Sequence, residues 1–133
     1  MLTIDTGFKA VAAPASKVYA YLADLNNWQG LMPDRVVNWR SDADSCGFTI
    51  KGMADINLRI LERTAETSLK LEAYDKTPFP FKLDIQIREA GSGAEACIVF
   101  NGEVNMFLRM VVEEPLKNFF TMLLEKLPSQ VEA

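Results

Sequence analysis

Apolar and polar residues alternate along most of the first hundred positions of the chain. Residues 2–12 repeat with a period of two, which predicts a first strand with one apolar side. Pro14 can begin a helix, and residues 15–24 carry apolar side chains at helical spacing. Residues 25–33 predict a second, shorter helical turn that ends at Gly and Pro. The apolar side of the first strand comprises Leu2, Ile4, Thr6, Phe8, Ala10 and Ala12.

Strand-like segments follow one another after this point. The clearest covers residues 81–88, where four large apolar residues alternate with Lys, Asp, Gln and Arg. Gly91-Ser92-Gly93 predicts a hairpin turn into the last strand. Short connections and one charged side per strand favour an antiparallel sheet with one solvated face. No repeat or linker interrupts the chain, which predicts one domain over residues 1–133. The six strands are expected at residues 35–40, 46–51, 56–60, 69–74, 81–88 and 94–105.

The last third of the chain changes to helical spacing. Residues 106–127 would form a helix roughly 30 Å long, and Pro115 is expected to kink or divide it. The apolar face of this helix needs a sheet to cover, which predicts an α+β fold: a curved antiparallel sheet of about seven strands wrapped around a long C-terminal helix. Core packing is the simplest role for the face, but Met and Phe also suit the wall of a cavity. The face comprises Met106, Phe107, Met110, Val111, Leu116, Phe119, Phe120, Leu123, Leu124 and Leu127.

Composition narrows the classes of partner. The chain has 14 basic and 18 acidic residues without a basic cluster, so we expect neither a nucleic acid nor an anionic membrane as partner. Charges interrupt every apolar stretch, so no integral membrane association is predicted. The N-terminus lacks the features of a signal peptide, and Cys46 and Cys97 match no metal or redox spacing, which favours a reducing cytoplasm. The sequence indicates no oligomeric state.

Motifs for catalysis, metals and cofactors are weak. The chain contains no His, which excludes Ser-His and Cys-His pairs and His-based metal sites. Residues 91–96 match a dinucleotide fingerprint, but strand residues follow where a helix is needed. Residues 42–53 lack the final Glu of a calcium loop, and the Glu113-Glu114 pair diverges on a helix. We therefore predict no catalytic residue, metal or cofactor, although acid–base work by a buried Tyr, Lys or carboxylate stays open.

The order of elements and several short segments resemble the START-like superfamily, also called SRPBCC, which has the helix-grip fold. Residues 13–24 resemble the family's Pro-initiated opening helix, and Asn27-Trp28 and Met32-Pro33 resemble its second helix and exit. Gly52 after a strand and Pro115-Leu116 also fit. The chain is most similar to small bacterial members of polyketide cyclase/dehydrase type. The resemblance implies an apolar ligand between sheet and long helix, whereas the lack of His excludes a His-dependent cyclase mechanism.

The leading hypothesis is a non-enzymatic protein that binds a lipid, polyketide or quinone-like molecule. Trp28 is expected at the entrance of the cavity. One alternative is a cyclase, dehydratase or hydrolase that uses buried Tyr or carboxylate groups. Another is an interaction module with a filled core, in which Phe79 of the 77–80 loop is exposed, although this loop could instead cap a pocket. The predicted ligand-binding residues are Trp28, Leu58, Leu71, Leu83, Phe100, Met106, Met110, Phe119 and Phe120.

Overall fold

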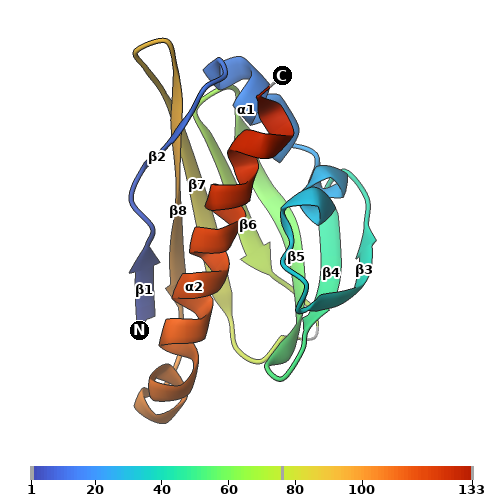
Figure 1. Ribbon diagram of the computed structural model, residues 1–133. Coiled ribbons are helices and arrows are strands. Elements are labelled where there is room, and N and C mark those ends of the chain that lie inside the picture. Colours follow the sequence, from blue (N-terminus) through green and yellow to red (C-terminus); the bar gives the residue numbers. More distant parts are fainter. Residues whose placement is uncertain (1, 76, 133) are drawn as a thin grey trace.

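The computed structural model describes residues 2–75 and 77–132, so residues 1, 76 and 133 of the predicted domain lie outside it. An eight-stranded antiparallel sheet, curved and unclosed, lies against one long helix (Figure 1). The strand order is β1-β8-β7-β6-β5-β4-β3, and β2 also pairs with β8. This confirms the predicted α+β class and the packing of the C-terminal helix against the sheet.

Each predicted segment corresponds to observed elements, with small shifts at the ends. The 91–93 turn is also confirmed, because Ala90 pairs with Gly93 across a two-residue loop. In chain order the elements are β1 (Leu2–Asp5), β2 (Lys9–Val11), α1 (Ala15–Leu22), η1 (Leu25–Leu31), β3 (Val36–Ser41), β4 (Ser45–Ile50), β5 (Ala54–Thr64), β6 (Ser68–Ala73), β7 (Phe81–Ala90), β8 (Gly93–Gly102) and α2 (Met106–Val131).

The first predicted strand is broken in two, which is why the sheet has eight strands rather than about seven. Asp5 pairs with Val99 of β8 and Lys9 pairs with Ala96, so one extra residue lies on the β1–β2 side. Gly7 has a φ of 72°, a backbone conformation that glycine adopts readily, and its N–H donates to the Asp5 carboxylate at 2.8 Å.

This break reverses which side chains of the segment point inward. Val11 and Ala13 are buried, whereas Ala10 and Ala12 are exposed. The prediction that one continuous alternation runs from Leu2 to Ala12 is therefore wrong after Gly7. A shift of one residue moves every later side chain to the opposite face of the sheet.

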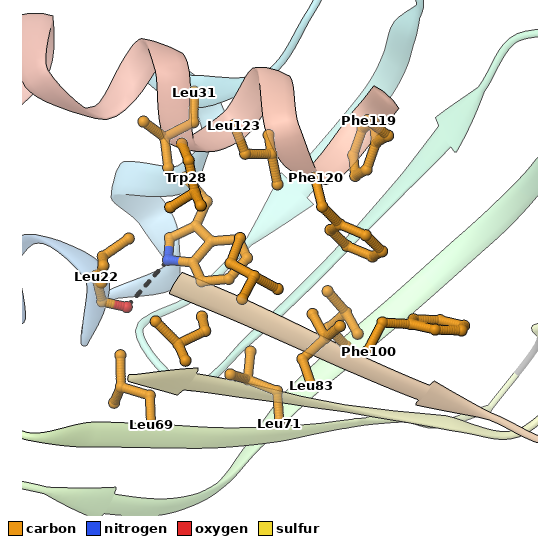
Figure 2. Packing of buried hydrophobic residues seen from close by; sticks show 14 of the residues in the cluster. Leu22, Trp28, Leu31, Leu69, Leu71, Leu83, Phe100, Phe119, Phe120 and Leu123 are labelled. Atoms are coloured by element: carbon orange, nitrogen blue, oxygen red, sulfur yellow. Dashed lines mark hydrogen bonds between the residues drawn. The ribbon is translucent and has the colours of Figure 1, made fainter. Parts of the chain in front are cut away.

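The core lies between the sheet and the second half of α2 (Figure 2). Leu69, Leu71 and Leu83 line the sheet side, and Leu123 lies opposite them on α2. The Trp28 indole fills the space between, and its Nε1–H donates to the Leu22 carbonyl at 3.0 Å. Since Leu22 ends α1, this bond satisfies a carbonyl that has no partner within the helix.

Helix α2 is continuous, so Pro115 lies inside it and does not divide it. Its N-terminus is capped by the Asn105 side chain, which accepts from Leu108 N–H at 2.8 Å. The later turns are covered, but several apolar side chains of the first turns are not. Met106, Phe107 and Met110 are 80 %, 75 % and 82 % exposed, which corrects the prediction that this part of the apolar face packs against the sheet. The first turns (orange in Figure 1) lie below the N-terminal end of β1 in that view.

Candidate ligand cavity

A cavity of about 490 Å³ lies beside the first half of α2. Its other walls are the ends of β4 and β5 with their connecting turn, and the segment around the start of β7. This volume is within the range of about 300–1,000 Å³ that is usual for small-molecule sites. The lining residues are Pro33, Arg35, Ile50, Lys51, Gly52, Met53, Ala54, Ile56, Pro78, Phe79, Phe81, Leu108, Val111, Val112, Glu114, Pro115, Leu116, Asn118, Phe119 and Met122.

Aromatic rings line the inner part of the cavity. The Phe119 ring stacks on Phe48 of β4 with centroids 6.0 Å apart and meets Phe120 edge-on at 5.5 Å. Phe79 and Phe81 lie 5.8 Å apart. Both contact Phe100, at 6.2 Å and 5.1 Å. Because each lining ring packs against another ring behind it, this wall is supported by the core.

The outer part of the cavity opens to solvent. Val111 and Met122 on α2 line it and are 57 % and 48 % exposed. Its polar lining residues are Arg35, Lys51, Glu114 and Asn118, and all four are exposed. The arrangement is therefore amphipathic, with an aromatic and aliphatic interior below a rim that carries charge.

A second cavity lies deeper in the core but holds only about 10 Å³. Trp28, Leu31 and Leu123 are among its lining residues. Such a space is about the size of one water probe and is apolar, so it offers no room for an organic ligand.

The predicted ligand-binding residues fall into three groups. Phe119 lines the large cavity. Met106 and Met110 extend into solvent on the first turns of α2. The remaining six are buried in the core and do not line this cavity, and Trp28, at 1 % exposed, lies in the interior rather than at an entrance. The ligand contacts of the nine residues stay a prediction. The six core residues are Trp28, Leu58, Leu71, Leu83, Phe100 and Phe120.

Sequence reasoning missed most of the lining, including Ile50, Ala54 and Val112. These residues carry no signal beyond an ordinary strand or helix pattern. The 77–80 loop did carry a signal, because its Thr-Pro-Phe-Pro sequence is apolar and rigid. Phe79 is buried and lines the cavity, so its predicted exposure is wrong and the alternative, that this loop borders a pocket, matches its position.

Groups capable of chemistry are sparse near the cavity. No Tyr and no buried carboxylate occurs among the described residues that line it. Burial raises the pKa of the Cys46 thiol to about 12, which leaves it protonated and a poor nucleophile at neutral pH. Within residues 2–75 and 77–132, no group of three or more His, Cys, Asp or Glu side chains could hold a metal ion. No helix in these ranges is long and apolar enough to cross a membrane.

No protein-family model and no curated protein matches the sequence. Solved structures do match. A protein from Chromobacterium violaceum has a TM-score of 0.77 at 20 % identity, with 98 % of this chain and 97 % of that chain covered. A protein from Thermus thermophilus has a TM-score of 0.79 at 16 % identity over 98 % and 97 %. The KanY protein has a TM-score of 0.78 at 12 % identity over all of both chains. At these identities the likeness concerns the fold alone, and over nearly its whole length the chain shares the α+β fold of these proteins.

Proposed function

We propose that this chain is a small START-like protein that binds a hydrophobic small molecule of the lipid, polyketide or quinone-like class. The observation that carries the proposal is the cavity of about 490 Å³ between α2 and the ends of β4, β5 and β7, with its apolar interior and open rim. The likeness of fold to KanY and the other solved structures adds support for a START-like architecture.

The size of the cavity distinguishes it from a packing defect. Protein interiors contain few voids larger than a water molecule. The core around Trp28 follows this rule, since its own cavity holds about 10 Å³. The cavity of about 490 Å³, bordered by the rings of Phe79, Phe81 and Phe119, is far larger and is in the size range of a small-molecule site.

The two alternative functions, an enzyme and an interaction module, fit this cavity less well. The enzyme alternative needs a buried Tyr or carboxylate near the bound molecule, and among the described lining residues the carboxylate is that of Glu114, which is exposed. An interaction module with a filled core would leave no ligand-sized space under α2. We therefore retain binding without evident catalysis.

Filling the cavity tests the proposal. Ala54 lies on the inward side of β5, two residues before the buried Ile56, so Ala54→Trp would place an indole in the cavity. Ala10→Trp is the matched control, because Ala10 is exposed on β2 and does not line the cavity. Thermal shift and native mass spectrometry would screen fatty acids, fatty alcohols, quinones and polyketides.

We expect at least one compound to raise the melting temperature of the wild type and of Ala10→Trp, and to leave Ala54→Trp unchanged. Far-UV circular dichroism confirms that both variants fold. The absence of any shift and of any adduct across the four classes would overturn the proposal. Equal binding by wild type and Ala54→Trp would show that the ligand binds outside this cavity.

A cytoplasmic location is part of the proposal. Cys46 and Cys97 are both free and buried, which suits a reducing compartment. Fractionation of cells that produce the protein, followed by immunoblotting, checks this point, and recovery in a secreted fraction would contradict it.

A further inference from the structure

Two cationic residues, Arg35 and Lys51, line the cavity and are exposed to solvent. They lie in the turns directly beyond the Val36–Ile50 pair of β3 and β4. The Lys51 N–H donates to the Arg35 carbonyl at 2.9 Å. This backbone contact brings two positively charged residues to one edge of the cavity.

Neither Arg35 nor Lys51 forms an ion pair within residues 2–75 and 77–132. The ion pairs there use Arg59, Arg63, Arg88 and Arg109. The Arg35 guanidinium has one long hydrogen bond, to the Lys51 carbonyl at 3.5 Å. Glu114 lines the facing wall but forms an ion pair with neither cation.

The two residues offer donors that suit an anionic group. Arg35 carries a planar guanidinium and Lys51 an ammonium, and neither has an acceptor of its own. An anion near Arg35 and Lys51 would therefore gain charge-assisted hydrogen bonds at the rim of the cavity.

We infer that the cavity takes an amphiphilic carboxylic acid. Its carboxylate would lie between Arg35 and Lys51, where the planar guanidinium fork matches the two carboxylate oxygens. Its apolar body would extend inward along Phe79, Phe81 and Phe119. This inference rests on the proposed function and specifies the class of ligand at the same site.

The test compares molecules that differ only in the head group. Isothermal titration calorimetry at low ionic strength and pH 7.5 would use decanoate, decanol and decyltrimethylammonium below their micelle concentrations. The variants are Arg35→Gln and Lys51→Gln. The control is Lys82→Gln, which removes the same charge from an exposed position of β7 outside the cavity.

Decanoate is expected to bind the wild type more tightly than decanol, and decyltrimethylammonium to bind most weakly. Arg35→Gln and Lys51→Gln should each weaken decanoate about five- to tenfold, the effect of one partly exposed charge-assisted hydrogen bond. Neither variant should change decanol affinity, and Lys82→Gln should leave all three compounds unchanged.

The outcomes separate the two proposals. Equal binding of decanoate and decanol, in the wild type and in both variants, would overturn the inference and leave the proposed function in place. Undiminished decanoate binding by Ala54→Trp would show that the anion is held at the surface, and would also overturn the inference. The absence of binding by every compound in both screens would overturn the proposed function and the inference with it.

Discussion

Replacing Trp28 with Phe tests whether Trp28 is a core residue or lies at the entrance of a ligand cavity. In the structure the indole is 1 % exposed, and its N–H is the donor to the last carbonyl of α1, that of Leu22. Phe retains one aromatic ring but cannot donate a hydrogen bond. The substitution therefore leaves a buried carbonyl without its partner and opens a small void among Leu31, Leu123 and their neighbours.

The magnitude follows from these two losses. An unsatisfied buried acceptor costs about 1–3 kcal/mol. The void left by the smaller ring adds about 1 kcal/mol, similar to other small core truncations. The free energy of unfolding should therefore fall by about 2–4 kcal/mol. With a urea m-value of about 2 kcal/mol per molar, which is usual for a small protein, the midpoint should fall by about 1–2 M.

Urea unfolding followed by far-UV circular dichroism measures this change without using Trp fluorescence as the signal. Trp39→Phe is the control, because its N–H bonds the exposed Ser41 hydroxyl and its ring can still stack on Phe48. We expect this control to cost under about 1 kcal/mol. A Trp28→Phe protein as stable as wild type but weakened in ligand binding would refute the reasoning and place Trp28 at an entrance.

Three further predictions concern single groups. Burial raises the pKa of the Cys46 thiol to about 12, so iodoacetamide at pH 8 should leave this thiol unmodified in the folded protein and alkylate it in urea. Peptide mass spectrometry measures the modification. Rapid labelling of Cys46 without urea would contradict its burial. The backbone N–H of Asp44 is the main cause that lowers the pKa of Asp42, so this carboxylate stabilises the fold above its ordinary pKa and loses that effect as pH falls. The difference in melting temperature between wild type and Asp42→Ala should thus be largest near neutral pH and shrink below about pH 4, whereas a constant difference would contradict the linkage. Gly93→Ala should cost about 1–3 kcal/mol in urea unfolding because its Cβ would run into a backbone carbonyl of β2, and an unchanged midpoint would show that β2 moves freely.

Local patterns in the sequence were sufficient for the elements and for most inward positions. Along β7, Phe81, Leu83, Ile85 and Ile87 are all buried, as their alternation predicts. The hairpin at Gly91 is equally local. Such features depend on backbone geometry over a few residues, which the side-chain period of a strand or a helix reports directly.

The break at Gly7 and the exposure of the first turns of α2 depended on tertiary structure. A period of two continues through Gly7 in the sequence, and only the pairing with β8 reveals the extra residue. Met106 and Met110 have helical spacing suited to packing, yet nothing in the described chain covers them. Whether an apolar face is covered depends on where distant elements end, and periodicity carries no information about this.

The opening feature of the chain, its alternation of apolar and polar residues, determined that a sheet and a long helix would share one core. It did not determine the distance between the sheet and the helix, and therefore did not determine whether a cavity lies between them. The cavity is bordered by the 77–80 loop, the β4–β5 turn and the first half of α2, with Phe79 and Phe119 in its lining. The width of this cavity is set by packing between segments that are remote in sequence. The contact between Arg35 and Lys51 likewise depends on how the chain folds back on itself. Only the tertiary structure therefore decided both features.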